Sequence, residues 1–135
     1  MVVVDTSVFS LFLRRDQALQ NEYLELFLDL FERNQIVLLG VVYQELLSGI
    51  RHEEQFNRLV DVLDGFDINY AGKADHLTAA RFYNICRSNG IQGSSIDFLI
   101  CAMSAEREHH ILTLDQDFDQ YAEYLPISLL KTNAE

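Results

Sequence analysis

The sequence predicts an α/β fold built on a mainly parallel sheet of about five strands that is flanked by helices. Short runs of β-branched or aliphatic residues alternate with segments in which apolar residues recur at helical spacing, and this order is typical of βαβ units. The first run, Val2-Val3-Val4, is uniformly apolar, as expected for a central strand buried on both faces. One proline, six glycines and the lack of any linker-like segment favour a single domain over residues 1–135.

Four later runs have the composition of strands, with β-branched or aliphatic residues bounded by polar ones. They lie at residues 36–39, 66–69, 111–114 and 127–130, and the run at 66–69 is the weakest. Together with residues 2–4 they give the strands of the predicted sheet.

Apolar residues at helical spacing fill the segments between the strands. The apolar residues between Phe56 and Leu63 follow the i, i+3, i+4, i+7 pattern of one such helix. Asn89-Gly90 is a C-cap signal that ends another helix, and Ser94 or Ser95 is expected to begin the next one. The predicted helices span residues 8–14, 22–32, 41–50, 56–63, 73–88 and 95–103.

The net charge of −11, from 21 acidic and 10 basic residues, argues against a nucleic-acid binder, because phosphate binding normally requires a basic face. Two exceptions stay open. Carboxylates gathered around metal ions bind an anionic substrate through the metal. A basic protein partner that neutralises the acidic surface is equally compatible with the charge.

No apolar run approaches the roughly 20 residues that span a bilayer, so no membrane association is expected. The start, Met1 to Asp5, lacks the basic leader and the long apolar core of a signal peptide, which favours a cytoplasmic protein. Cys86 and Cys101 have no metal-ligand spacing, and we interpret them as reduced structural residues.

Asp5 comes directly after the first predicted strand, and Asp115 directly after the strand at 111–114. In an open parallel sheet, ligands bind beyond the carboxyl ends of the strands, near the point where the strand order reverses. Both acids are therefore expected at that edge, with Asp117 close enough to Asp115 to complete a metal shell. The structural alternatives are an N-cap role for Asp5, which Ser7 could also fill, and a solvated acidic loop around Asp115.

Glu45 and Asp97 lie at or near the first turns of two predicted helices. The inward-facing neighbours Val42 and Leu46 place Glu45 near the boundary of the core, although most isolated helix glutamates are solvated. Asp97 stands three residues after Ser94, a spacing that approximates a capping box. A carboxylate in this first turn also gains from the helix dipole while pointing into the crevice above the sheet, so the two roles are compatible.

Together the four acids indicate a site for divalent metal ions. Oxygen ligands without His or Cys suit Mg²⁺ or Mn²⁺ rather than Zn²⁺. Clustered carboxylates raise one another's pKa values, so such a cluster is stable only where it recruits a cation. Metal ions held in this way activate water and stabilise the leaving oxygen of a phosphodiester. Thr6, Ser7 and Thr113 stand beside the carboxylates and are candidates to hydrogen-bond them or the phosphate.

Four strings in register resemble the PIN-domain family, and most of all its VapC-like toxins from type II toxin–antitoxin pairs. They are Val3-Val4-Asp5-Thr6-Ser7-Val8, Glu45-Leu46-Leu47-Ser48-Gly49, Ser95-Ile96-Asp97-Phe98-Leu99-Ile100-Cys101-Ala102 and Leu112-Thr113-Leu114-Asp115-Gln116-Asp117-Phe118. The resemblance covers essentially the whole chain and implies a three-layer, PIN-like fold.

The resemblance also implies an Mg²⁺- or Mn²⁺-dependent endoribonuclease that hydrolyses RNA. The residues that match the family's catalytic and metal-binding acids are Asp5, Glu45, Asp97 and Asp115, with Asp117 as a frequent additional metal ligand. Thr113 matches the hydroxyl residue that usually precedes the last acidic pair. Family members commonly form homodimers, and a VapB-like antitoxin inhibits them by inserting a tail, often carrying arginine, into the acidic site.

Other acidic α/β domains fit the sequence less well. A receiver domain requires paired acids near its first strand and a lysine after a late strand, whereas here Asp5 stands alone and Asp115 follows the late strand. A haloacid-dehalogenase-like phosphatase requires Asp-x-Asp, which Asp5-Thr6-Ser7 does not supply. A binding module whose acidic rim docks a basic peptide, without catalysis, stays open as the alternative function.

Overall fold

The computed structural model, which describes residues 1–14 and 21–132, contains a five-stranded sheet in the order β3-β2-β1-β4-β5. All four neighbouring pairs are parallel, so the predicted α/β fold with a parallel sheet is confirmed. The strands are β1 (Val2–Val4), β2 (Ile36–Leu39), β3 (Asp67–Asn69), β4 (His110–Leu112) and β5 (Ser128–Leu129).

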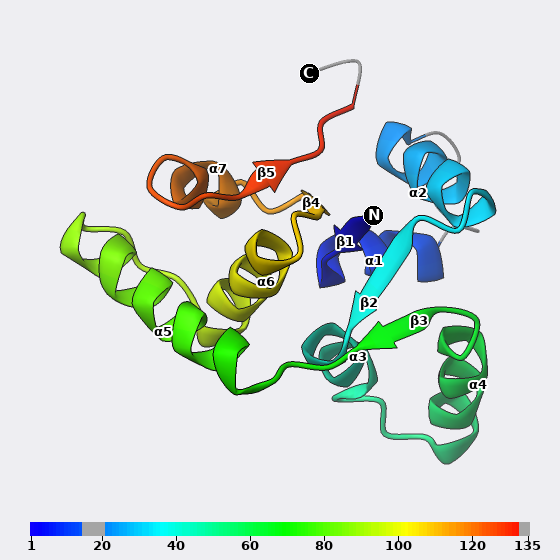
Figure 1. Cartoon of the computed structure of the whole chain (residues 1–135). Helices are drawn as coiled ribbons and strands as arrows, with labels where there is room; N and C mark the ends of the chain where they lie inside the picture. Colours follow the sequence, from blue (N-terminus) through cyan, green and yellow to red (C-terminus); the bar gives the residue numbers. More distant parts are fainter. Residues whose placement is uncertain (15–20, 133–135) are drawn as a thin grey trace.

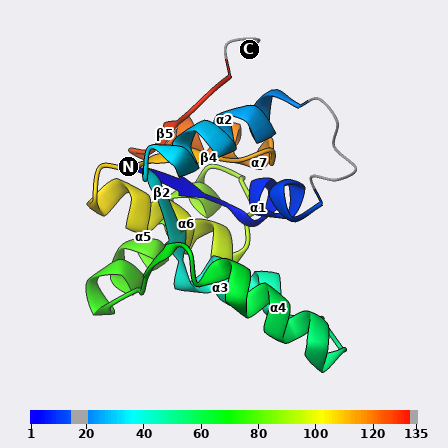
Figure 2. The same ribbon diagram turned by 90° about the vertical axis from the view of Figure 1, so that its right-hand side faces the viewer.

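Seven helices flank the sheet in the described part of the chain (Figure 1). They are α1 (Thr6–Leu13), α2 (Glu22–Glu32), α3 (Gly40–Leu47), α4 (Glu53–Leu63), α5 (Lys73–Ser88), α6 (Ser95–Glu106) and α7 (Asp117–Ala122). The chain first builds the sheet outward from β1 to β3 and then crosses back to add β4 and β5 on the other side of β1. Because crossovers between parallel strands are right-handed, this reversal puts the early and late helices on opposite faces. Figures 1 and 2 accordingly show α5 and α6 packed side by side, away from α1 and α2.

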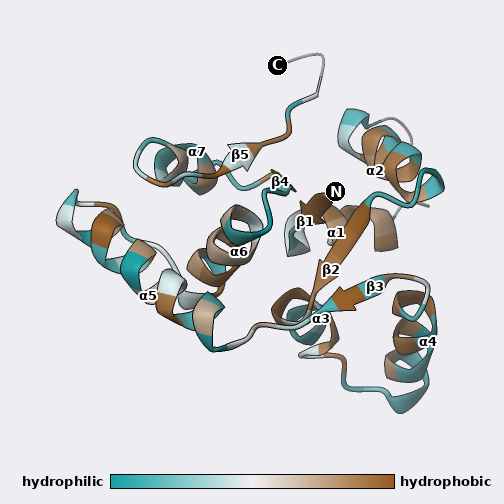
Figure 3. Ribbon diagram, in the orientation of Figure 1, coloured by the Kyte–Doolittle hydropathy of each residue, from teal (hydrophilic) through white to brown (hydrophobic). Residues whose placement is uncertain are grey.

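The core is centred on the two middle strands, because every residue of β1 and β2 is buried. Figure 3 shows both as continuous hydrophobic strands. A second part of the core joins α1 to α2 through aromatic rings. Phe12 stacks on Phe27 at a centroid distance of 4.6 Å, and Phe9 meets Phe27 edge-on at 5.3 Å. This packing fixes α1, and therefore the residue at its N-terminus, relative to the sheet.

The structure differs from the sequence prediction in the bounds of several elements. Helix α4 begins at Glu53, three residues early, and α6 extends three residues further, to Glu106. Helix α7 was not predicted at all. Strand β4 ends at Leu112, two residues early, because the N–H of Leu114 bonds to the Ser7 hydroxyl at 3.0 Å instead of to a neighbouring strand. Helix α3 ends at Leu47, three residues early, because Ser48 is extended (ψ 134°) and Gly49 has a φ of 89°, in the left-handed region.

Cys86 and Cys101 are buried thiols without a disulfide, and burial raises the pKa of both. A buried thiol with a raised pKa is unreactive, which agrees with the structural role expected for both residues. None of the helices in the described part of the chain is both long enough and apolar enough to span a bilayer.

Candidate metal centre

The four predicted acids lie on segments that meet at the carboxyl edge of the sheet. Asp5 directly follows the central strand β1, and its N–H bonds to the carbonyl of Leu112 in β4 at 3.1 Å. Glu45 lies in α3, which begins directly after β2, the other neighbour of β1. Helix α6 carries Asp97 in its first turn and leads into β4, so it starts at this edge. Asp115 follows β4. The strand order reverses between β1 and β4, where α/β sheets bind their ligands.

Asp5 is the most completely fixed of these side chains and is only 6% exposed. One carboxylate oxygen accepts hydrogen bonds from the N–H (2.8 Å) and the hydroxyl (2.5 Å) of Ser7, and the other accepts from the Thr113 hydroxyl at 2.5 Å. Asp5 is also the N-cap of α1, so the structural alternative is correct and is compatible with a site role. Burial raises the pKa of Asp5, and the hydrogen bonds from Ser7 and Thr113 oppose that rise.

Thr113 links the two acids that follow β1 and β4. Its hydroxyl donates to Asp5 and accepts a hydrogen bond of 3.0 Å from the N–H of Asp115. The Asp115 carboxylate in turn accepts a hydrogen bond of 2.9 Å from the N–H of Asp117, the first residue of α7. Asp115 and Asp117 are both exposed, so their side chains are open to solvent above the buried Asp5.

Glu45 is exposed, although Val42 and Leu46 on either side of it in α3 are buried. Its carboxylate accepts a hydrogen bond from the hydroxyl of Thr6, the residue that follows Asp5. The contact joins α3 to the first residue of α1 and brings Glu45 to the chain segment that carries Asp5.

Asp97 is half-buried, and its backbone N–H bonds to the Ser94 hydroxyl at 3.0 Å. Of the two serines predicted to begin this helix, Ser94 is therefore the one that caps α6. Burial raises the pKa of Asp97, the Tyr121 hydroxyl lowers it, and the negative charges of Asp115 and Asp5 raise it again. The negative charges of both acids therefore oppose ionisation of Asp97.

Tyr121 is a site residue that the sequence did not indicate. It lies on α7, is completely buried, and donates a hydrogen bond of 2.7 Å to a carboxylate oxygen of Asp97. Burial and the bond to Asp97 raise the pKa of Tyr121, so its hydroxyl keeps its proton and acts as a donor. The only sequence signal was an aromatic residue in an acidic segment, which is equally typical of a surface loop.

The donor set fits a hard divalent cation by its chemistry, because the candidate ligands are all carboxylate oxygens. As the side chains stand, no three His, Cys, Asp or Glu residues within 1–14 and 21–132 are grouped to hold an ion. Glu45 and Asp115 are exposed and can change rotamer without disturbing the core, whereas Asp5 is fixed. A shared cation would remove the repulsion that raises the pKa of Asp97.

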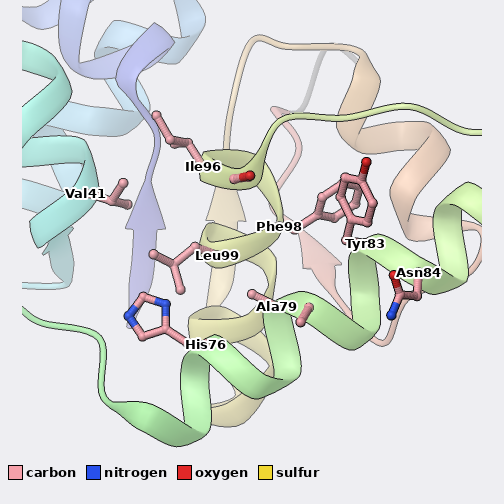
Figure 4. Close-up of a pocket in the computed structure, with 10 residues that line it drawn as sticks. Val41, His76, Ala79, Tyr83, Asn84, Ile96, Phe98 and Leu99 are labelled. Atoms are coloured by element: carbon pink, nitrogen blue, oxygen red, sulfur yellow. The ribbon is translucent and has the colours of Figure 1, made fainter.

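Several cavities adjoin this edge, including one beside β4 and one between α3, α5 and α6. The first, of about 530 Å³, is lined by Thr113 and Asp115 and, from α2 and the chain after β5, by Tyr23 and Lys131. The second, of about 510 Å³, is mainly apolar, and in Figure 4 Val41, His76 and Leu99 point into it from α3, α5 and α6. A partly polar cavity therefore lies beside Asp115, and an apolar groove lies between α3, α5 and α6.

Solved structures of other proteins share this fold. A chain of VapBC2 from Rickettsia felis, bound to a DNA fragment from its promoter, superposes with a TM-score of 0.78 at 16% identity, over 96% of this chain and 98% of that one. A chain of FitAcB from Neisseria gonorrhoeae gives a TM-score of 0.75 at 19% identity, over 97% of both chains. At these identities the likeness shows the shared fold.

Among curated proteins, no sequence matches the chain significantly. The sequence model of the PIN domain matches residues 2–124, a span that contains all of the candidate acids, from Asp5 to Asp117. Because the match covers most of the 135 residues, and because the sheet and its helices have the PIN-like arrangement, the chain belongs to the PIN domain family.

Proposed function

We propose that this protein is a metal-dependent endoribonuclease and the toxin of a VapBC-like toxin–antitoxin pair. The observation that carries the proposal is the position of Asp5. This buried carboxylate lies at the reversal of the strand order, where the Thr113 hydroxyl connects it to the N–H of Asp115. Its neighbour Thr6 contacts Glu45. Burial of a carboxylate is costly unless a charge or several hydrogen bonds compensate, and function is a common reason to keep it.

Asp5, Glu45, Asp97 and Asp115 would hold Mg²⁺ or Mn²⁺, with Asp117 as an additional ligand. When bound, such an ion lowers the pKa of a water molecule and stabilises negative charge on the leaving oxygen of a phosphodiester. Ser7 and Thr113 hold both oxygens of Asp5 in place, so this ligand needs no reorientation. These acids also recruit a cation before an anionic RNA approaches a chain of net charge −11.

We propose two protein partners for the same chain. A VapB-like antitoxin with an arginine-bearing tail would neutralise the acidic centre, in agreement with the net charge of −11.

A second copy of the chain would cover the exposed Leu77, Tyr83 and Ile85 of α5, which are 50%, 38% and 41% exposed. Light scattering that gives the mass of a monomer at micromolar concentration would contradict the homodimer.

The alternative is an acidic docking module without catalysis. It is favoured by the side-chain arrangement described above, in which no three of the described acids are grouped around one point. Such a module would bind a basic peptide and would have no specific affinity for Mn²⁺, so metal binding separates the two functions.

Asp5→Asn and Asp97→Asn should each abolish Mg²⁺-dependent cleavage of RNA while the fold stays intact. Asparagine keeps the shape of the side chain and is an equally good N-cap, so α1 should still form in Asp5→Asn. The loss of negative charge removes the affinity for the cation. Cleavage of a mixed RNA pool, followed on a denaturing gel with and without Mg²⁺, measures the effect.

Asp61→Asn is the matched control, because Asp61 is an exposed residue of α4 outside the site. It should cleave RNA like the unmodified protein. Full activity in Asp5→Asn or in Asp97→Asn would refute the roles assigned to these residues.

A further inference from the structure

Tyr121 is held by the core on all sides of its ring. The side chain has no exposed surface. Its ring packs against Phe98 of α6 at a centroid distance of 5.0 Å and against Phe118 of α7 at 5.1 Å. Because these rings are themselves buried, the position of the Tyr121 hydroxyl is set by the core rather than by solvent.

The hydroxyl occupies a space that exists only because residue 93 is glycine. A Cβ atom at Gly93 would stand 2.5 Å from the Tyr121 hydroxyl oxygen and 2.8 Å from the ring of Phe98. Gly93 is not among the glycines with a positive φ, which are Gly49 and Gly90. Glycine is therefore required at position 93 for space and not for its backbone conformation.

The Tyr121 hydroxyl held in this way bonds to Asp97. Its backbone is fixed by the Ser94 cap, and its side chain receives the 2.7 Å hydrogen bond from Tyr121. The bond joins α7 to α6 across 24 residues of sequence. A donor that is fixed by the core and bonded to one carboxylate oxygen restricts the rotamer of that carboxylate.

We propose that Tyr121 is a positioning residue that fixes the Asp97 carboxylate for a divalent cation, and that its hydroxyl can do so because Gly93 leaves space for it. This inference rests on the proposed metal-dependent function. Asp97 then parallels Asp5, whose oxygens are fixed by the hydroxyls of Ser7 and Thr113. The two less exposed acids would be pre-oriented, and the exposed Glu45 and Asp115 would complete the site when the ion enters.

Tyr121→Phe tests the inference, because it removes the hydroxyl and keeps the ring in the core. We expect the dissociation constant for Mn²⁺, measured by isothermal titration calorimetry, to rise about tenfold or more, the usual effect of losing a hydrogen bond to a metal ligand. A purely structural tyrosine would instead lower the melting temperature of the metal-free protein and leave the Mn²⁺ affinity unchanged, and that result would overturn the inference.

Tyr124→Phe is the matched control. Tyr124 follows α7 and is 44% exposed, so the same chemical change is made three residues away without affecting Asp97. Its affinity for Mn²⁺ should equal that of the unmodified protein.

Gly93→Ala provides a second, independent variant, since its Cβ would displace the hydroxyl. We expect weaker Mn²⁺ binding, and we expect the double variant Gly93→Ala/Tyr121→Phe to bind Mn²⁺ no more weakly than Gly93→Ala alone. Losses that add up in the double variant would show that Gly93 does not act through the hydroxyl. If Gly93→Ala fails to fold, Tyr121→Phe still decides the inference.

The outcomes separate this inference from the proposed function. An unmodified protein that binds Mn²⁺ but cleaves no RNA contradicts the nuclease and leaves the role of Tyr121 measurable by calorimetry. If the unmodified protein cleaves RNA and Tyr121→Phe binds Mn²⁺ as tightly as it does, only the positioning role is contradicted. An unmodified protein without Mn²⁺ affinity contradicts both.

Discussion

Hydroxyl groups are the recurrent partners of the acids in this centre. Ser7 and Thr113 bond to Asp5, and Tyr121 bonds to Asp97. A hydroxyl donates a hydrogen bond to a carboxylate without neutralising it, whereas a lysine or arginine at the same place would compete with a cation. The residue types around the acids therefore favour binding of an ion from solution over an internal ion pair.

Thr113→Val should weaken both the fold and the activity. Valine has the shape of threonine but leaves an oxygen of the buried Asp5 and the N–H of Asp115 without their partner. We expect a loss of about 1–3 kcal/mol in the free energy of unfolding and a roughly 10- to 100-fold decrease in the rate of RNA cleavage. Urea denaturation and a cleavage assay measure the two effects.

Thr113→Ser should keep most of the stability and of the rate of RNA cleavage that Thr113→Val loses, because serine retains the hydroxyl. Thr78→Val is the control, since the Thr78 hydroxyl bonds to Glu106 at 2.7 Å in an exposed contact between α5 and α6. Equal rates of cleavage in Thr113→Val and Thr78→Val would contradict a specific role for Thr113.

Among single residues, the sequence identifies those that lie directly after a strand, because the end of the strand sets their position. Asp5 and Asp115 were predicted at the edge of the sheet because each follows an apolar strand, and the structure places them there. Tyr121 could not be predicted, because its contact with Asp97 depends on how α7 packs against α6. Packing between elements leaves no periodic signal in the sequence.

Among the elements, α5 and α6 are joined by an ion pair at the end opposite to Asp97. Asp75, in the first turn of α5, is buried and accepts hydrogen bonds of 2.8 and 3.0 Å from Arg107, the C-cap of α6. Asp75 also accepts from the N–H of Gly72 at 2.9 Å and so caps α5. The pair holds α6 against α5, and α6 carries Asp97.

Asp75→Asn should lower the free energy of unfolding by about 2 kcal/mol at pH 7, the usual cost of losing hydrogen bonds to a charged partner. Asp29→Asn is the control, because the Asp29–Arg33 pair is more than half exposed on both sides and should contribute about 0.5 kcal/mol or less. Thermal unfolding followed by circular dichroism compares the two variants. Equal losses would show that burial of Asp75 has no energetic consequence.

The effect of Asp75→Asn should also depend on pH. The hydrogen bonds from Arg107 hold the pKa of Asp75 below its ordinary value of 3.8. Folding therefore favours the charged carboxylate, and the stabilisation is complete above pH 3.8 and is lost as the pH falls through the lowered pKa. The stability difference between Asp75→Asn and the unmodified protein should shrink below that pH.

Element by element, the long periodic helices were the most predictable. The bounds of α2 and α5 agree with the predicted ones, since each has a clear apolar pattern or a C-cap signal. Helix α7 escaped prediction because it has six residues, three of them polar or acidic beside Phe118 and Tyr121, and no side-chain cap. Its stability comes from tertiary packing of the two buried rings.

Across the whole molecule, the strand order explains why distant acids meet. Alternating strands and helices predicted a parallel sheet, but they did not determine the order β3-β2-β1-β4-β5. That order depends on the direction in which each crossover turns, which apolar periodicity does not encode. By placing β1 between β2 and β4, it brings Asp5 between the segments that carry Glu45 and Asp115.

Diffraction from crystals soaked in Mn²⁺ tests the proposed metal centre most directly, because the anomalous signal locates the ion without assumptions about the reaction. We predict a Mn²⁺ peak about 2.1 Å, the bond length of a hard octahedral cation, from carboxylate oxygens of Asp5 and Asp97, with Glu45 or Asp115 turned toward it. Crystals in which Mn²⁺ binds elsewhere, or in which these carboxylates stay without an ion at millimolar Mn²⁺, would contradict it.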